Sequence, residues 1–350
     1  MSIAFQTLAE LAAHGFDTVI DVRSPAEYAE DHFPGAINLP VLDDAERARV
    51  GTIYTQDSPF TARKLGAALV ARNAARHLEG ALAEKPGGWR PLVYCWRGGQ
   101  RSGSFATILS QVGWRAEVIE GGYRSYRRLV TTAMHDTPLR HRLVLLDGNT
   151  GTAKTDLLAL LAGQGVQTVD LEGLAAHRGS VFGAVATPQP SQKAFESALA
   201  LALEALDPVR PVLVEAESSK IGRCLIPPTV WAAMLAAPRI RVAASLTARA
   251  AYLARAYADL AADREALKAT LALLVPLQGH AKVEHWQALA DQDALEQLAG
   301  ELMEQHYDPR YGKSRGRSDP AILAEIEADS LTPEVLPELA NRIASHLAKL

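Results

Sequence analysis

Short apolar runs alternate with stretches of helical periodicity in the first part of the chain. The runs FDTVIDVR (16–23), RPLVYC (90–95) and RAEVIEGG (115–122) have the length and composition of buried strands. Between them, residues 61–83 and 101–113 carry apolar positions at helical spacing. This β/α alternation predicts a mainly parallel sheet with helices on both of its faces.

The same alternation begins again after Pro138. Residues 190–206 predict a long helix, and residues 247–306 are rich in Ala and Leu with a 3.6-residue period, which predicts three or four more. The segment AILAEIEA (321–328) fits a strand as well as a helix. The predicted strands of this half are residues 141–148, 166–173, 210–218 and 239–246.

A chain of 350 residues exceeds one typical domain, so we expect two. The pattern places an α/β parallel-sheet domain at 1–132 and a second α/β domain at 133–350, with a helical insertion at about 247–306.

The first residues show no basic stretch followed by an apolar one, and no apolar run reaches the ~18 residues of a membrane span. Two cysteines, Cys95 and Cys224, argue against a disulfide framework and against zinc. We therefore expect a cytoplasmic monomer that does not bind membranes.

The formal charge of −4 hides two basic segments. Residues 123–142 hold five Arg and one Asp, and residues 307–318 hold three Arg, one Lys and one Asp. Such local concentration can bind phosphates on an otherwise acidic protein, although a solvated linker and a loose tail would give the same pattern. Charge alone leaves nucleic-acid binding open.

The segment LVYCWRGGQRSGSF (92–105) places a cysteine directly after a buried strand. In open α/β sheets this edge binds ligands, and a glycine-rich turn at the start of a helix can hold an anion or a thiolate. We expect a lowered pKa for Cys95, whereas an inert cysteine at a strand end is the alternative. The expected anion loop consists of Trp96, Arg97, Gly98, Gly99, Gln100, Arg101 and Ser102.

A second loop, DGNTGTAKTDLL (147–158), follows a strand and opens a helix, as in phosphate-binding P-loops. Ala replaces the usual glycine at position 153, which costs roughly 1–2 kcal/mol if that residue needs a positive φ. A slightly reshaped loop would avoid that cost. A helix N-terminus with a capping Thr and no ligand is the alternative to anion binding. Glu215 and Glu217, at the end of a predicted strand, are either metal-assisting carboxylates or surface groups. The expected diphosphate loop consists of Gly148, Asn149, Thr150, Gly151, Thr152, Ala153, Lys154 and Thr155.

The cysteine loop resembles the active-site loop of rhodaneses, in which the cysteine carries sulfur or selenium. DVRSPAEY (21–28) and HFPGAINLP (32–40) resemble hallmark segments of the same family, over about residues 5–130. We expect Asp21 and Arg23 to form a structural ion pair. Five residues separate Cys95 from Arg101, a spacing shared with cysteine phosphatases. The loop should therefore suit a phosphate-bearing donor such as selenophosphate, with phosphatase activity as a rival.

Five segments carry a second resemblance: CWRGGQRSGSFATIL (95–109), GGYRSYRR (121–128), DLEGLAAHRGSVFG (170–183), QPSQKAFE (189–196) and HYDPRYG (306–312). Through these segments, the chain as a whole resembles the tRNA 2-selenouridine synthases. That resemblance implies that a wobble 2-thiouridine is first S-geranylated from geranyl diphosphate and then selenated from selenophosphate. We expect the diphosphate in the loop 148–155 and selenophosphate at Cys95, with no tightly bound cofactor or assigned metal site; a Mg²⁺ requirement stays open.

The resemblance also implies tRNA partners, such as those for Lys, Glu and Gln. Arg124, Arg127 and Arg128 are the expected phosphate contacts. Trp96 could stack on the wobble base or support the loop as a core residue. The rival functions are a cysteine phosphatase or sulfurtransferase fused to a nucleotide-binding module, a P-loop kinase or ATPase, and a non-catalytic tRNA-binding protein.

Overall fold

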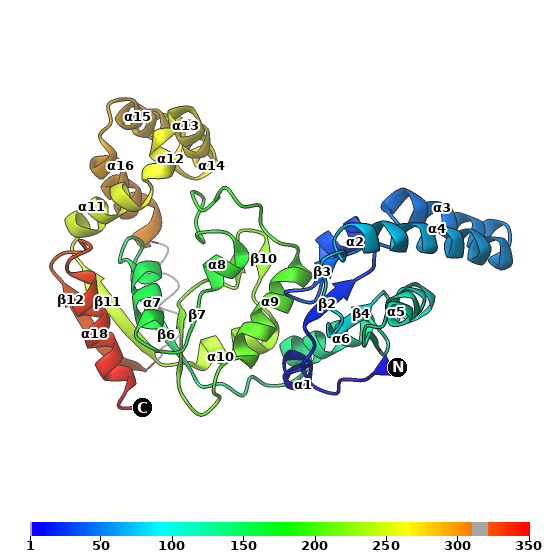
Figure 1. Cartoon of the computed structure of the whole chain (residues 1–350). Helices are drawn as coiled ribbons and strands as arrows, with labels where there is room; N and C mark the ends of the chain where they lie inside the picture. Colours follow the sequence, from blue (N-terminus) through cyan, green and yellow to red (C-terminus); the bar gives the residue numbers. More distant parts are fainter. Residues whose placement is uncertain (1, 310–320) are drawn as a thin grey trace. The chain divides into compact units, whose positions relative to one another are not determined.

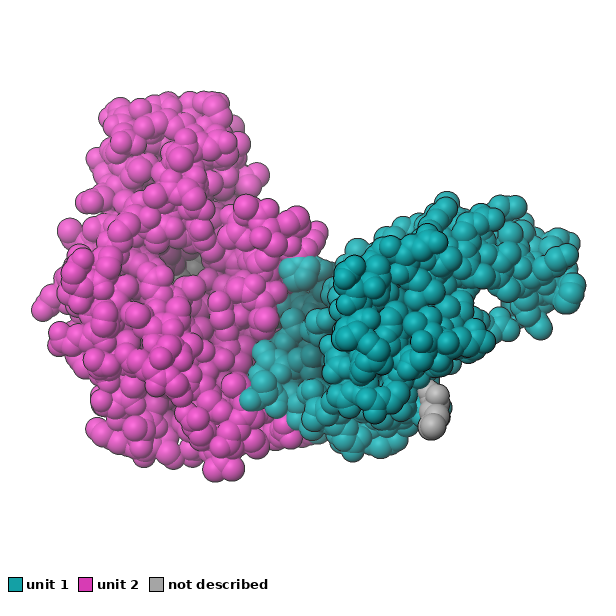
Figure 2. Space-filling view, viewed as in Figure 1, with its two compact units in different colours: residues 1–137, 190–205 teal, residues 138–189, 206–350 magenta. Residues whose placement is uncertain are grey.

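The computed structural model describes residues 2–309 and 321–350. Arg310 and the basic residues that follow it, expected to contribute to nucleic-acid binding, lie outside the described residues. The chain divides into two compact units (Figure 2). Unit 1 comprises Met1–Thr137 and Pro190–Ala205, and unit 2 comprises Pro138–Gln189 and Leu206–Leu350. Within the described parts of the chain, no helix is both long and apolar enough to cross a bilayer.

Unit 1 is built on a five-stranded parallel sheet in the order β1-β5-β4-β2-β3 (Figure 1). Its central strand β4 is buried at every position, as its apolar run predicted. It pairs with β2 and β5. The strands are β1 (Ser2–Ile3), β2 (Thr18–Asp21), β3 (Ile37–Asn38), β4 (Pro91–Tyr94) and β5 (Glu117–Ile119).

The helices of unit 1 bury one apolar core with the sheet, which includes Phe105, Leu109 and Trp114. Helix α4 begins at a Ser58 cap with Pro59 in its first turn, which ends the preceding helix and starts the next. The helices are α1 (Leu8–Ala12), α2 (Pro25–Glu30), α3 (Asp44–Gln56), α4 (Pro59–Glu79), α5 (Gln100–Val112) and α6 (Tyr123–Thr131), which continues into the π-helical turn η1 (Thr132–Asp136).

Helix α9 (Gln192–Glu204) groups with unit 1 although it follows two strands of unit 2 in sequence. It packs on α1, α6 and η1, and Glu196 pairs with Arg127 of α6. Ser191 caps its first turn by accepting a hydrogen bond from the backbone of Ala194. The sequence predicted the helix itself, but it gave no sign that residues 190–205 leave the unit formed by their neighbours.

Unit 2 also holds a five-stranded parallel sheet, in the order β12-β11-β6-β8-β7. The ambiguous segment near residue 325 is a strand, because it pairs with β11 along its whole length. A short antiparallel pair, β9 (Lys220–Ile221) and β10 (Cys224–Leu225), follows β8. The sheet strands are β6 (Leu143–Asp147), β7 (Thr168–Val169), β8 (Val212–Glu215), β11 (Arg239–Ala244) and β12 (Ile322–Ala328).

The helical insertion forms a group of helices with its own apolar core around Trp286, Leu271 and Leu274 (Figure 1). Its members are α11 (Leu246–Ala256), α12 (Ala258–Ala262), α13 (Arg264–Ala272), α14 (Val275–Gln278), α15 (His280–Asp291) and α16 (Leu295–Leu302), which ends in the π-helical turn η2 (Met303–Tyr307). The helices α7 (Lys154–Gly163), α8 (Leu171–Ala175), α10 (Pro228–Ala236) and α18 (Leu336–Leu347) complete the described part of unit 2.

Candidate functional site

Cys95 follows the last residue of β4, at the carboxyl edge of the unit 1 sheet, and is 4% exposed. The turn between β5 and α6 supports its loop, because the amide of Tyr123 donates to the carbonyl of Cys95 at 2.8 Å. Gly98 has φ 64°, and a Cβ there would lie 2.5 Å from the carbonyl oxygen of Ile119. A Cβ on Gly122 would overlap the carbonyl oxygen of Cys95. Glycine is therefore required at both positions for the loop to close.

The thiol of Cys95 is stabilised as a thiolate. Burial by itself would raise its pKa. The hydroxyl of Ser102 donates to Sγ at 3.2 Å, and the backbone amides of Ser102 and Arg97 and the charge of Arg101 add to this effect. Together they outweigh burial and hold the pKa of Cys95 below its usual value, in the direction expected from the sequence.

Arg101 is held in place beside the loop. Its guanidinium pairs with Glu27 at 3.0 Å, and Arg47 pairs with the same carboxylate at 3.0 Å. Arg97 and Gln100 are exposed, whereas Trp96 is half-buried and stacks on Tyr123 with ring centroids 5.2 Å apart. One face of Trp96 therefore has a partner within the fold.

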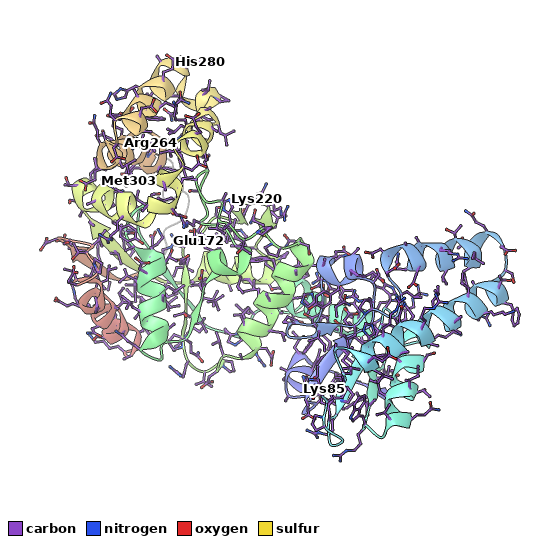
Figure 3. The ribbon with its side chains drawn as sticks, turned by 45° about the horizontal axis from the view of Figure 1, so that its top comes forward. Lys85, Glu172, Lys220, Arg264, His280 and Met303 are labelled. Atoms are coloured by element: carbon purple, nitrogen blue, oxygen red, sulfur yellow. The ribbon has the colours of Figure 1, made fainter. Side chains whose placement is uncertain are left out.

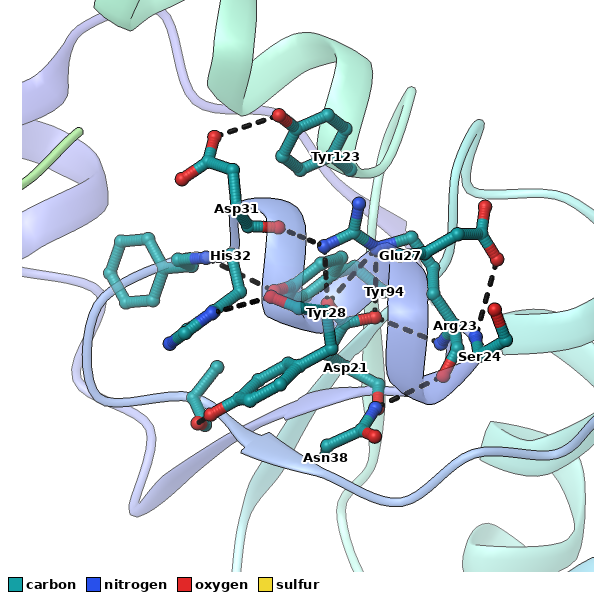
Figure 4. A network of polar contacts seen from close by, with 12 residues as sticks. Asp21, Arg23, Ser24, Glu27, Tyr28, Asp31, His32, Asn38, Tyr94 and Tyr123 are labelled. Atoms are coloured by element: carbon teal, nitrogen blue, oxygen red, sulfur yellow. Dashed lines mark hydrogen bonds and ion pairs between the residues drawn. The ribbon is translucent and has the colours of Figure 1, made fainter. Parts of the chain in front are cut away.

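Asp21 and Arg23 form the structural ion pair that the sequence suggested (Figure 4). Both are buried, and Arg23 donates to both carboxylate oxygens of Asp21 and to the carbonyl of Asp31. The guanidinium also lies 4.0 Å from the ring centroid of Tyr123, which donates to the Asp31 carboxylate at 2.7 Å. The network joins β2, α2 and α6 beneath the cysteine loop.

The three expected phosphate contacts on α6 differ in their surroundings. Arg124 and Arg128 are exposed. Arg127 forms an ion pair with Glu196 of α9 and donates to the carbonyl of Lys193, so its guanidinium already has partners within unit 1. Arg124 and Arg128 are the better candidates for contacting a phosphate.

In unit 2, residues 148–153 connect β6 to α7, and Lys154 and Thr155 open that helix, in the arrangement of a P-loop. Ala153 has φ 57° and is 2% exposed, so it adopts the left-handed conformation that glycine usually supplies. The strain of roughly 1–2 kcal/mol is partly offset by the burial of a methyl group, worth about 0.8 kcal/mol, and by the lower entropy of Ala in the unfolded chain. The loop therefore keeps its geometry with Ala in this position. Lys154 Nζ donates to the carbonyl of Gly148 at 3.1 Å.

Two residues distant in sequence hold the outer side of this loop. Arg249 of α11 donates to both carboxylate oxygens of Asp308, at 3.0 and 2.8 Å, and to the carbonyl of Thr150 at 3.1 Å. Asn149 also donates to Asp308 at 3.2 Å. Asp308 lies in the segment HYDPRYG, to which the sequence assigned no chemistry. The structure gives it a positioning role for the P-loop.

A cluster of carboxylates lies at the start of α7. Oxygens of Glu172, Glu215 and Glu217 all lie within 4.8 Å of one another, and Thr155 donates to Glu172 at 3.4 Å. Burial and the repulsion between the carboxylates raise the pKa of Glu172 and Glu215, against the opposing charge of Lys154. Glu215 is fully buried, and within the described residues neither of its oxygens accepts a hydrogen bond. The sequence pointed to Glu215 and Glu217, but it missed Glu172 of α8 (Figure 3).

The donor set fits a divalent cation. Hard cations such as Mg²⁺ bind carboxylate and hydroxyl oxygens, and a buried carboxylate without a partner is costly unless something compensates it. Glu172, Glu215 and Glu217, with the hydroxyl of Thr155, could hold such an ion beside the P-loop.

The fold and the two sites define the class of protein: a rhodanese-type cysteine unit joined to a P-loop unit. Family models agree with this division. The rhodanese-like domain matches residues 5–129, and the tRNA 2-selenouridine synthase AAA domain matches residues 141–273.

Comparisons with individual proteins extend the match over most of the chain. The tRNA 2-selenouridine synthase of Cupriavidus necator is 33% identical over 357 residues, covering 93% of this chain and 95% of the relative. That of Hahella chejuensis is 40% identical over 256 residues, covering 68% of this chain. The aligned part spans only 63% of the Hahella protein, and 65% of a Shewanella halifaxensis relative. The chain belongs to the tRNA 2-selenouridine synthase family.

Among solved structures, the N-terminal domain of a putative ATP/GTP binding protein from Clostridium difficile 630 is 36% identical to this chain. The match covers 37% of this chain and 98% of that one, with a TM-score of 0.32.

Proposed function

We propose that this chain replaces the sulfur of a wobble 2-thiouridine in tRNA with selenium, in two steps that use its two anion loops in turn. The observation that carries the proposal is the cysteine loop, in which a buried thiol with a lowered pKa is followed by Arg101 at phosphatase-like spacing. Family membership and the P-loop of unit 2 support the division into two steps. The tRNA substrates are those with a 2-thiouridine at the wobble position, such as the tRNAs for Lys, Glu and Gln.

In the first step the 2-thiouridine sulfur attacks C1 of geranyl diphosphate. A C1–S bond forms, the C1–O bond breaks, diphosphate leaves, and the base loses its N3 proton to solvent. Lys154 and the amides at the start of α7 stabilise the charge that develops on the leaving diphosphate. In the alkylated base, the sulfur is a thioether on an electron-poor ring and can leave as a thiol.

The carboxylate cluster has a role in the same step. We propose that Glu172, Glu215 and Glu217 hold a divalent cation with the hydroxyl of Thr155. When bound, such an ion would neutralise part of the charge on the diphosphate. The protein's own contribution is to orient the carboxylates from α8 and β8 towards the P-loop.

In the second step Cys95 acts as a nucleophile towards selenophosphate. Attack at phosphorus forms an Sγ–P bond, breaks the P–Se bond and releases selenide. Selenide then attacks C2 of the S-geranyl base, a C2–Se bond forms, and geranylthiolate leaves and takes up a proton. Water hydrolyses the Sγ–P bond to give phosphate. This series of steps needs no oxidant or reductant. If Cys95 carried selenium as a perselenide instead of phosphate, the selenium isotope pattern in mass spectra of the trapped enzyme would reveal it.

Arg124 and Arg128, exposed on α6, are the proposed contacts to the tRNA backbone. Because such contacts release counterions, replacing both with Gln should weaken tRNA binding and flatten its dependence on salt. An unchanged salt dependence would remove these residues from the tRNA interface.

Two variants test the division of labour. Lys154→Ala should reduce geranylation by at least about 100-fold while still selenating tRNA that is already S-geranylated. Cys95→Ala should geranylate normally and accumulate S-geranyl tRNA. Nucleoside mass analysis after incubation with 2-thiouridine tRNA measures both steps. Lys220→Ala, at an exposed lysine (Figure 3), and Cys224→Ala are the matched controls.

Loss of both steps in either variant would contradict the assignment of one step to each loop. Turnover of a simple phosphate ester by the wild-type protein, without any action on 2-thiouridine tRNA, would instead support a cysteine phosphatase.

A further inference from the structure

An apolar pocket lies beside the P-loop, within unit 2. About 610 Å³ of space lies between the atoms that surround it, a volume that includes space open to solvent, and Thr150 of the P-loop forms part of its wall. Almost all of the remaining wall is hydrophobic and comes from the loop before α9 and from the helical insertion. The apolar side chains that line the pocket include Phe182, Leu253, Tyr257, Leu267, Leu295 and Met303.

The two ends of the pocket are distinguished by their contacts. Leu253 lies against the P-loop, because a Cβ on Gly151 would lie 3.1 Å from its side chain. Met303 Sδ is 3.7 Å from the guanidinium of Arg249, which holds the carbonyl of Thr150. Leu267 and Leu295 instead belong to the apolar core of helices α13–α16. The pocket therefore runs from the phosphate-binding loop into the helical insertion.

A ligand that fills both places has an anionic head and an apolar tail, which is the chemistry of a prenyl diphosphate. We propose that this pocket holds the prenyl chain, with the diphosphate in the loop 148–155. Leu253 and Met303 surround the carbons near the diphosphate (Figure 3 shows Met303), and Ala261, Leu267 and Leu295 surround the distal end. The inference rests on the proposed function, and it adds that helices α12, α13 and α16 set the length of the chain that is accepted.

Direct binding tests the pocket without the tRNA reaction. Titration calorimetry of the full chain should show geranyl diphosphate binding at least about 100-fold more tightly than inorganic diphosphate, because several buried methylene groups each add to affinity. Ala261→Phe places a ring in the distal part of the pocket and should weaken geranyl diphosphate at least about 10-fold while leaving inorganic diphosphate unchanged. The control is Ala262→Phe, the exposed neighbouring residue on the same helix.

Chain-length selection gives a second measurement. With 2-thiouridine tRNA as acceptor, Leu295→Ala should raise the kcat/KM ratio of farnesyl to geranyl diphosphate about 10-fold or more, since it removes part of the distal wall. Ala261→Phe should shift the preference towards dimethylallyl diphosphate.

The outcomes separate the two ideas. If the wild-type protein geranylates tRNA but Ala261→Phe and Leu295→Ala change neither affinity nor chain-length preference, the pocket is wrong and the proposed function stands. Suppose instead that the wild-type protein fails to geranylate tRNA but binds geranyl diphosphate, with the affinity lowered by Ala261→Phe. In that case the proposed function is wrong and the pocket stands. Equal affinity for geranyl and inorganic diphosphate overturns the pocket.

Discussion

Cys95 experiences two opposing effects on its ionisation. Burial in the core of unit 1 favours the neutral thiol, whereas Ser102, two backbone amides and Arg101 favour the thiolate. The second set of effects is larger, so the thiolate of Cys95 forms at a lower pH than that of an ordinary cysteine. In Cys224 burial outweighs the opposing charge of Arg223, and its pKa is raised. The loop around Cys95, rather than burial in general, makes the difference between the two thiols.

Ser102→Ala should raise the pKa of Cys95 by about one unit, since a hydrogen bond to a charged group contributes about 1.5–3 kcal/mol and one unit corresponds to 1.36 kcal/mol. The ultraviolet absorbance of the thiolate, taken as the difference between each protein and its Cys95→Ser form, measures this pKa. Selenation should then reach half its maximum at a higher pH than in the wild type. Ser104→Ala, at an exposed position of the same helix, is the control. An unchanged titration in Ser102→Ala would show that the hydroxyl does not stabilise the thiolate.

At the scale of elements, three pieces of unit 2 meet at the P-loop: α7 with Lys154 and Thr155, α8 with Glu172, and the end of β8 with Glu215. The folded-state pKa of Glu215 is raised, so its carboxylate destabilises the fold at every pH above the ordinary carboxyl range. An ionised, buried carboxylate at neutral pH lowers the stability of the fold, and such a loss is typical of sites whose residues serve binding.

Glu215→Gln should therefore leave the melting temperature of the metal-free protein equal or higher at pH 7. The same variant should weaken binding of Mn²⁺, followed by electron paramagnetic resonance in the presence of diphosphate, at least about 10-fold. Glu265→Gln, at an exposed glutamate, is the control. The cation site is wrong if Mn²⁺ binds Glu215→Gln as well as it binds the wild type.

At the scale of the whole molecule, the cysteine loop and the P-loop belong to different compact units, and each loop is built from residues of its own unit. In the proposed function, S-geranyl tRNA is the product of the first step and the substrate of the second. If each unit completes its own chemistry, the two steps need not occur on the same protein molecule.

A mixture of Lys154→Ala and Cys95→Ala proteins should therefore make 2-selenouridine from 2-thiouridine tRNA, although neither variant does so alone. The rate should rise with protein concentration, because the intermediate must pass between molecules. Nucleoside mass analysis of single variants and of the mixture provides the comparison. A mixture that accumulates S-geranyl tRNA without product would show that the intermediate has to stay on one chain.

Features encoded in neighbouring residues could be predicted from the sequence. The strand, cysteine, glycine turn and helix at 92–105 are contiguous, and so are the parts of the P-loop at 147–158. The parallel sheets followed from apolar runs separated by helical periodicity. The sequence left open whether Ala153 adopts a positive φ or the loop is reshaped, and the structure shows the positive φ.

Features that join distant residues were decided by the tertiary structure. The carboxylates of Glu172 and Glu215 lie close together, and Asp308 forms an ion pair with Arg249. Helix α9 belongs to unit 1, although the residues before and after it in sequence belong to unit 2. The segment at 322–328, which fitted a strand or a helix, is a strand because it pairs with the backbone of β11 at the edge of the sheet. The apolar pocket likewise depends on how the helical insertion packs against the P-loop. Periodicity and spacing report the local conformation of a segment, whereas packing between elements selects its partners, and that information is spread over the whole chain.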